Sequence, residues 1–185
     1  MKNNPYVERI FKLKRTKDML QLFPNIKEWT ESMGAYNAIV KHISFNFKLN
    51  DPDVTVLVVG DGSTPRTGAM IALQSNWKVF SIDPKLKKFK TKRIKEISRL
   101  TVLPIRIEEL IPSLCSSCIF DKVIIVCVHS HASTFLSWTK INAKIKALIN
   151  IPCCYKHDMP FKANLEYKDE FILSKKNTVQ IWNTL

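Results

Sequence analysis

VTVLVVGDGSTPRTGAMIALQSNWKVFSIDP, residues 54–84, has the order of a strand, a glycine loop, a helix, a second strand and an acidic residue. The apolar run 54–59 is typical of a strand that is buried on both faces. Gly60 and Gly62 allow the backbone to turn sharply and to approach a ligand closely. Asp83 follows about 20 residues after the glycines, where an acidic side chain can bind ribose hydroxyls. This order of parts indicates a site for a nucleotide-like cofactor.

The glycine loop admits two interpretations. In the first, the loop and the end of the second strand cradle a cofactor; the residues concerned are Gly60, Asp61, Gly62, Ser63, Thr64, Asp83 and Pro84. In the second, the loop is an ordinary strand-to-helix turn, which favours the same residue types. Ser63 or Thr64 is expected to cap the following helix, whose first turn tolerates Pro65. Asp83 could likewise cap a helix that begins at Pro84, and capping and ribose binding can coexist.

Composition limits the class of protein and of partner. The chain of 185 residues suits one domain, and its 45% hydrophobic content is that of a globular protein. A net charge of +13 favours nucleic acid over a membrane surface as the binding partner, and we expect RNA rather than DNA. A protein partner is also compatible with this charge. The alternative is a merely basic protein. No run approaches the ~18 apolar residues of a membrane-spanning helix, and no secretory signal is expected. The odd number of cysteines, five, fits a reducing location, in the cytoplasm or the nucleus.

The chain divides near residue 50. Residues 1–50 are expected to form a helical N-terminal extension, and residues 51–185 an α/β domain. One helix should begin at Asn4 and reach Leu22, before Pro24 breaks it, and a second should cover residues 25–42. The polar, proline-containing segment 50–53 marks the boundary.

Strands and helices alternate after residue 53. Strands are predicted at 54–60, 78–82, 101–106, 122–128 and 147–151, helices at 65–76, 85–99 and 132–142, and an irregular or weakly helical crossover at 105–114. Such alternation predicts a doubly wound, mostly parallel sheet. In the tail, FILSKKNTVQIWN at residues 171–183 contains two apolar runs around a polar turn, which predicts an antiparallel hairpin at the C-terminus.

This layout resembles the class I S-adenosylmethionine-dependent methyltransferases, whose Rossmann-like sheet has about seven strands and ends in an antiparallel hairpin. VLVVGDGS at 56–63 is similar to the family's glycine loop, and SIDP at 81–84 to its second-strand acid. VCVHSHAS at 126–133 and INIPCCYKH at 149–157 look like one branch of methyltransferase-like proteins, some of them RNA-directed. In that branch the fourth strand ends near a His and the fifth near Cys-Cys. The resemblance covers about residues 54–185.

The resemblance implies methyl transfer from S-adenosylmethionine, with RNA or another anionic molecule as acceptor. It also implies that Glu108, after the third strand, approaches the adenine edge, although a solvated Glu108–Glu109 pair is the alternative. Two departures matter: Val58 stands where the family usually has an acid, and a closely spaced third glycine is absent. The alternative function is therefore a catalytically degenerate protein of this fold that binds nucleic acid or a protein partner. A nicotinamide-dependent enzyme is disfavoured because G-x-G-x-x-G is incomplete.

His and Cys residues gather where the fourth and fifth strands are predicted to end, and the carboxyl ends of such strands are neighbours. The set is His129, His131, Cys153, Cys154 and His157. One interpretation is a substrate site, with His129 or His131 as hydrogen-bond partner or general base, His129 also near the cofactor, and Pro152 and the cysteines shaping the acceptor slot. A zinc site is a second, although the spacing matches no standard zinc module. Buried structural roles are a third.

Cationic residues supply the remaining candidates for acceptor binding. Arg66, near a helix N-terminus, would suit an anionic ligand. The predicted helix 85–99 carries many lysines, including Lys87 and Lys88, which could form a phosphate-binding surface or simply a solvated face. The C-x-x-C at residues 115–118 precedes a strand, which favours a loop with two incidental thiols over a redox site.

Overall fold

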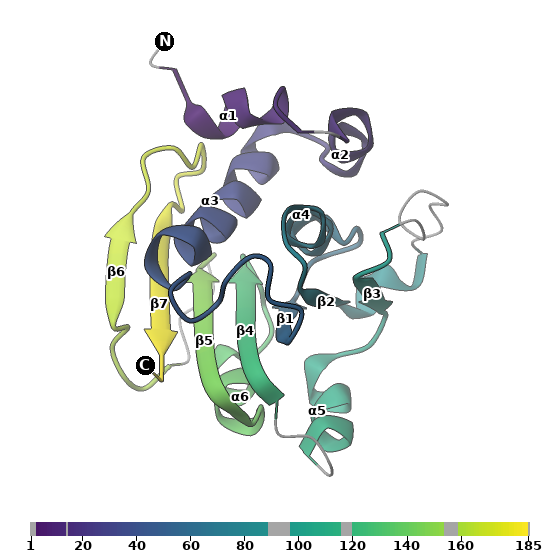
Figure 1. Ribbon diagram of the computed structural model, residues 1–185, viewed down its shortest axis with the longest axis vertical. Coiled ribbons are helices and arrows are strands. Elements are labelled where there is room, and N and C mark those ends of the chain that lie inside the picture. The colour runs from purple at the N-terminus through teal and green to yellow at the C-terminus, as the bar shows by residue number, and fades with distance from the viewer. Residues whose placement is uncertain (1–2, 14, 89–96, 116–119, 154–158, 185) are drawn as a thin grey trace.

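The computed structural model describes residues 3–13, 15–88, 97–115, 120–153 and 159–184. A seven-stranded sheet of order β3-β2-β1-β4-β5-β7-β6 forms its centre (Figure 1). All neighbouring pairs are parallel except β5–β7 and β7–β6, so β7 alone runs against the others. The strands are β1 Val54–Val59, β2 Lys78–Ile82, β3 Leu100–Leu103, β4 Phe120–Val128, β5 Ala143–Ile151, β6 Leu165–Lys168 and β7 Thr178–Asn183. The mostly parallel, doubly wound sheet with a C-terminal antiparallel hairpin is confirmed.

Helices cover both faces of the sheet (Figure 1). Helices α1 to α4 contribute to one core, and α5 and α6 contribute to the other. The helices are α1 Pro5–Ile10, α2 Thr16–Leu22, α3 Ile26–His42, α4 Arg66–Gln74, the 3₁₀ helix η1 Pro84–Lys88, α5 Ile107–Cys115 and α6 Thr134–Lys140. Of the described helices, none combines the length and apolar character that crossing a membrane requires.

The central strands are apolar on both faces because both faces are covered. Along β4, Ile124 and Val126 belong to the core that includes α3 and α4, whereas Val123 and Ile125 belong to the core that includes α5 and α6. All four side chains are fully buried. Val58 of β1 lies in the first of these cores, so the position where the family usually has an acid is part of the packing.

The predicted single helix from Asn4 to Leu22 is wrong, because the chain forms α1 and α2 instead. Asn4 caps α1 as expected, with its side chain accepting from the Tyr6 and Val7 amides. The break follows from Thr16, whose hydroxyl lies 2.7 Å from the carbonyl oxygens of both Ile10 and Leu13. A side-chain donor there satisfies carbonyls at the end of α1 and lets the chain turn.

The C-terminal hairpin is present, but its first strand is β6, Leu165–Lys168, rather than the apolar run at 171–173. That run instead lies against α3: Ile172 is buried, and the Leu173 amide donates to Thr30 Oγ1 at 3.0 Å. The β6 strand forms the edge of the sheet and is mostly exposed, and its four residues, LEYK, are too short a run to predict a strand. The crossover at 105–114 is also more regular than expected, since it forms α5.

Candidate functional site

The glycine loop lies between β1 and α4, at the carboxyl end of the sheet. Gly60 and Gly62 have φ of +76° and +79°, a region that side chains rarely adopt. A Cβ on Gly60 would lie 2.2 Å from Ser130 Oγ, so this glycine permits close packing against the loop after β4. A Cβ on Gly62 would meet nothing within 4 Å. Gly62 therefore presents its backbone to open space.

Asp61 organises this loop from within. Its buried carboxylate accepts hydrogen bonds from the Thr67 and Gly68 amides, each at 3.0 Å, and from Ser81 Oγ at 2.7 Å. Asp61 thus satisfies the amino end of α4, and the expected cap from Ser63 or Thr64 is wrong. Burial raises the pKa of Asp61 to about 6, against the lowering effect of these hydrogen bonds.

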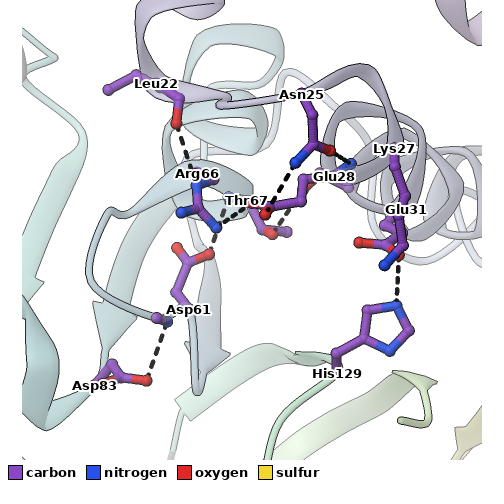
Figure 2. A network of polar contacts seen from close by, with 12 residues as sticks. Leu22, Asn25, Lys27, Glu28, Glu31, Asp61, Arg66, Thr67, Asp83 and His129 are labelled. Carbon is purple, nitrogen blue, oxygen red and sulfur yellow. Dashed lines mark hydrogen bonds and ion pairs between the residues drawn. The ribbon is translucent and has the colours of Figure 1, made fainter. Parts of the chain in front are cut away.

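Asp83 connects the end of β2 to the glycine loop. Its Oδ2 accepts from the Gly62 amide at 3.0 Å, the contact that leaves Asp83 in Figure 2. Its Oδ1 accepts from the Lys85 amide at 2.7 Å. The second contact is the predicted cap of a helix that begins at Pro84, which is confirmed by η1. Asp83 also lines a cavity, so capping leaves its carboxylate at a ligand-accessible surface.

Two cavities adjoin the glycine loop. The Asp83 cavity, of about 380 Å³, is lined by Gly60, Gly62, Asp83, Pro84, Glu108, His129 and His131, with seven further residues. The Glu31 cavity, of about 450 Å³, is lined by residues of α3, the glycine loop, the end of β4 and the segment around Ser174. Both cavities include Gly60, Gly62 and His129, so they meet at the carboxyl ends of β1 and β4.

His129 stands at the junction of the two cavities. Its backbone has φ of +50°, and its Nε2 lies 2.9 Å from Glu31 Oε1 (Figure 2). The two atoms are at ion-pair distance, but their directions are not those of a hydrogen bond. Burial acts to raise the pKa of Glu31, yet His129, Ser174 and Lys27 together lower it below the ordinary value.

Glu31 was not found from the sequence. It lies in the second turn of α3, far before the glycine loop in the chain, and its side chain is 4% exposed. The available signal was the polar triplet Thr30-Glu31-Ser32 between the apolar positions Trp29 and Met33, all of which are buried. A carboxylate on the buried face of a helix needs a partner. An acidic residue at this position of the apolar pattern was therefore the signal that could have identified Glu31.

Arg66 faces the N-terminal helices. Its Nε donates to the Leu22 carbonyl at 3.1 Å, and its guanidinium pairs with Glu28 (Figure 2). It lines the Glu31 cavity as well, so a ligand would meet a cation that already has a carboxylate partner.

The remaining predicted residues are distributed unevenly. Cys153 lines the Glu31 cavity, and Glu108 and His131 line the Asp83 cavity. The linings of the two cavities include none of Ser63, Thr64 and Pro152. Cys154, His157 and the side chains of Lys87 and Lys88 lie outside the described part, as do Cys118 and residues 89–96 of the predicted basic helix. Within the described part, no three His, Cys, Asp or Glu residues are grouped so as to hold a metal ion.

Comparisons with known proteins identify the fold. No family model matches the chain, and no curated protein matches it. The crystal structure of a mutant of MtNAS is similar over 97% of this chain and 68% of that chain, with 12% identity and a TM-score of 0.51. The crystal structure of the 23S rRNA methyltransferase ErmE has 17% identity and a TM-score of 0.40 over 65% of this chain, which spans 45% of ErmE. With the strand order, the MtNAS likeness shows a Rossmann-like fold of the class I methyltransferase type.

Proposed function

We propose that this protein binds S-adenosylmethionine and transfers its methyl group to RNA or another anionic acceptor. The observation that carries the proposal is the pair of cavities that meet at Gly60, Gly62 and His129. They lie at the carboxyl ends of adjacent parallel strands, where open α/β sheets bind ligands. One cavity offers a carboxylate at the end of β2 for a ribose, and the other leaves room for an acceptor.

The adenosine part would occupy the Asp83 cavity. Asp83 would accept from the ribose hydroxyls, Pro84 and Glu108 would border the adenine, and the open side of Gly62 would admit the ligand next to the backbone. The cofactor supplies a methyl group on a sulfonium, so the protein's main tasks are to align the acceptor and to exclude water. His129, at the junction, would hold the acceptor or take up its proton, and His131 is the second candidate.

The acceptor would enter through the Glu31 cavity. Lys27, Arg66 and Lys176 line it, which suits an anionic molecule, and the net charge of +13 favours RNA. Cys153, which also lines it, supports the proposed acceptor slot, for which Pro152, Cys154 and His157 remain candidates, with Lys87 and Lys88 as further contacts. Pro152, Cys153, Cys154 and His157 lie in segment 149–157, which resembles a branch of methyltransferase-like proteins, some of them RNA-directed.

A non-catalytic function of the same fold is the second candidate. The observation that favours it is Val58, which is 1% exposed and packs in the core, so the end of β1 gives the site no carboxylate. A protein of this kind would bind nucleic acid or a protein partner without transferring a methyl group.

Calorimetric titration with S-adenosylmethionine and S-adenosylhomocysteine tests the proposal. We expect micromolar binding to the wild type and at least about tenfold weaker binding to Asp83→Asn, which keeps the size of the side chain but not its charge. Asp53→Asn is the matched control, because Asp53 is exposed in the turn before β1, at the opposite end of that strand. A folded wild type that binds neither ligand would contradict the methyltransferase proposal and leave the binding subunit.

A further inference from the structure

We propose that Glu31 of α3 binds the positively charged amino group of the cofactor, in the Glu31 cavity. This inference rests on the proposed function and adds a specificity-determining residue to it. The sequence pattern of the glycine loop does not contain this residue, because it comes from a helix that precedes the first strand.

The position of Glu31 follows from the direction in which the ligand must run. With its ribose at Asp83, the ligand can extend past Gly60 and Gly62 into the adjoining Glu31 cavity, which shares both glycines. The amino-acid end of the cofactor carries an ammonium group, which requires an anionic or strongly accepting partner when it leaves water. A carboxylate at the inner end of the site would meet that need.

Three carboxylates line that cavity, and they differ in their partners. Glu28 pairs with the guanidinium of Arg66, and Asp61 accepts from two backbone amides and the Ser81 hydroxyl. Glu31 lies on the face of α3 that points at His129, and it forms ion pairs with His129 at 2.9 Å and with Lys27 at 3.7 Å (Figure 2). Its Oε1 is buried, and the contact with His129 Nε2 lacks the directions of a hydrogen bond.

Glu31 itself supplies the negative charge that a cationic group needs, in a cavity that cations also border. Lys27 Nζ lies 3.7 Å from Glu31 Oε1, but the lysine side chain is 57% exposed and can move into solvent. His129 and Lys27 hold the pKa of Glu31 below its ordinary value against the effect of burial, so the carboxylate is ionised at neutral pH. An ammonium group can add a charge-assisted hydrogen bond to Oε1, which is stronger than a bond between neutral groups.

A different role for the same residue is to orient His129 without touching the ligand. In that case replacing Glu31 would weaken every ligand alike or none at all, because the effect would not depend on an ammonium group. The two roles are separable with ligands that differ in that group alone.

The experiment measures calorimetric affinity for S-adenosylhomocysteine and for its deaminated analogue, with wild type, Glu31→Gln and Glu8→Gln. Glu8 is exposed on α1 and lines neither cavity, so Glu8→Gln controls for the loss of one negative charge. We expect Glu31→Gln to bind S-adenosylhomocysteine about 10- to 100-fold more weakly and to bind the deaminated analogue within about twofold of wild type. Glu8→Gln should match wild type with both ligands.

Binding to wild type alone supplies a test that does not depend on the folding of a variant. There the deaminated analogue should bind about 10- to 100-fold more weakly than S-adenosylhomocysteine. Equal affinity of the two ligands for wild type, or an equal loss of both in Glu31→Gln, would overturn the assignment of Glu31 while leaving cofactor binding intact. If wild type binds neither ligand, the proposed function itself is overturned, and Glu31 with it.

Discussion

Asp61 shows how a residue in a ligand loop can serve the protein rather than the ligand. The sequence placed it among the cradle residues, between two glycines. In the structure three donors reach its carboxylate, and the residue also borders the Glu31 cavity, next to the open side of Gly62. Its contribution to a cofactor site is therefore the shape of the loop.

The pH dependence of stability tests this role of Asp61. Burial raises its pKa from 3.8 to about 6, so the folded protein holds a proton that the unfolded chain releases. The resulting stabilisation is complete below pH 3.8 and is lost as the pH rises through about 6; it amounts to about 3 kcal/mol at most. Because the side chain of Asp61→Asn cannot titrate, this variant lacks the stabilisation that the wild type gains at low pH. The difference in free energy of unfolding between wild type and variant, measured by urea denaturation, should therefore increase as the pH falls from about 7.5 to about 4.5. A deficit that is constant over this range would contradict the raised pKa.

At the scale of elements, the two loops at the carboxyl ends of β1 and β4 pack against each other through Gly60 and Ser130. This contact fixes the junction where the two cavities meet. Gly62, two residues further along, has the same backbone conformation but no such neighbour. A side chain added at Gly62 would therefore cause backbone strain alone, whereas one added at Gly60 would cause backbone strain and a clash with Ser130.

Alanine substitutions measure that difference. Gly62→Ala should lower the free energy of unfolding by about 1–2 kcal/mol, because a Cβ strains a residue with positive φ. Gly60→Ala should cost about 1–3 kcal/mol more, since the new Cβ would overlap Ser130 Oγ and Cβ. In chemical denaturation, adding Ser130→Gly to Gly60→Ala should recover part of the additional loss in free energy of unfolding. Adding Ser130→Gly to Gly62→Ala should recover none of its loss. Equal losses for the two glycines would show that the loops do not pack as described.

Elements that bury a continuous apolar run could be predicted from the sequence, and those defined by distant contacts could not. The central strands β1 and β4 were found because burial on both faces leaves a nearly continuous apolar run. Strand β6 was missed because an exposed edge strand needs little apolar surface. The glycines and Asp83 follow from local spacing, but Glu31 joins the candidate site only when α3 folds over the sheet. No local pattern records that contact.

At the scale of the whole molecule, charge is the property that connects the fold to its proposed acceptor. Two lysines, Lys27 and Lys176, border the Glu31 cavity at the carboxyl edge of the sheet. Lys78 and Lys144 lie near the first residues of β2 and β5, at the amino ends of these strands and so at the opposite end of the sheet. If RNA reaches the site through the Glu31 cavity, the first pair should contribute to its binding and the second should not.

The salt dependence of RNA binding distinguishes the two edges. We expect the wild type to bind RNA with an affinity that falls steeply as salt rises, because each neutralised phosphate adds about 0.7–0.9 to the logarithmic slope. Lys27→Gln with Lys176→Gln should weaken binding and reduce this slope by about 1–2. Lys78→Gln with Lys144→Gln removes the same charge and should leave the slope almost unchanged. Filter binding at salt concentrations from about 50 to about 200 mM measures the affinity for RNA and its salt slope. Equal effects of the two double variants would mean that net charge attracts RNA without directing it to the carboxyl edge, and the acceptor would then have to be sought among smaller anions.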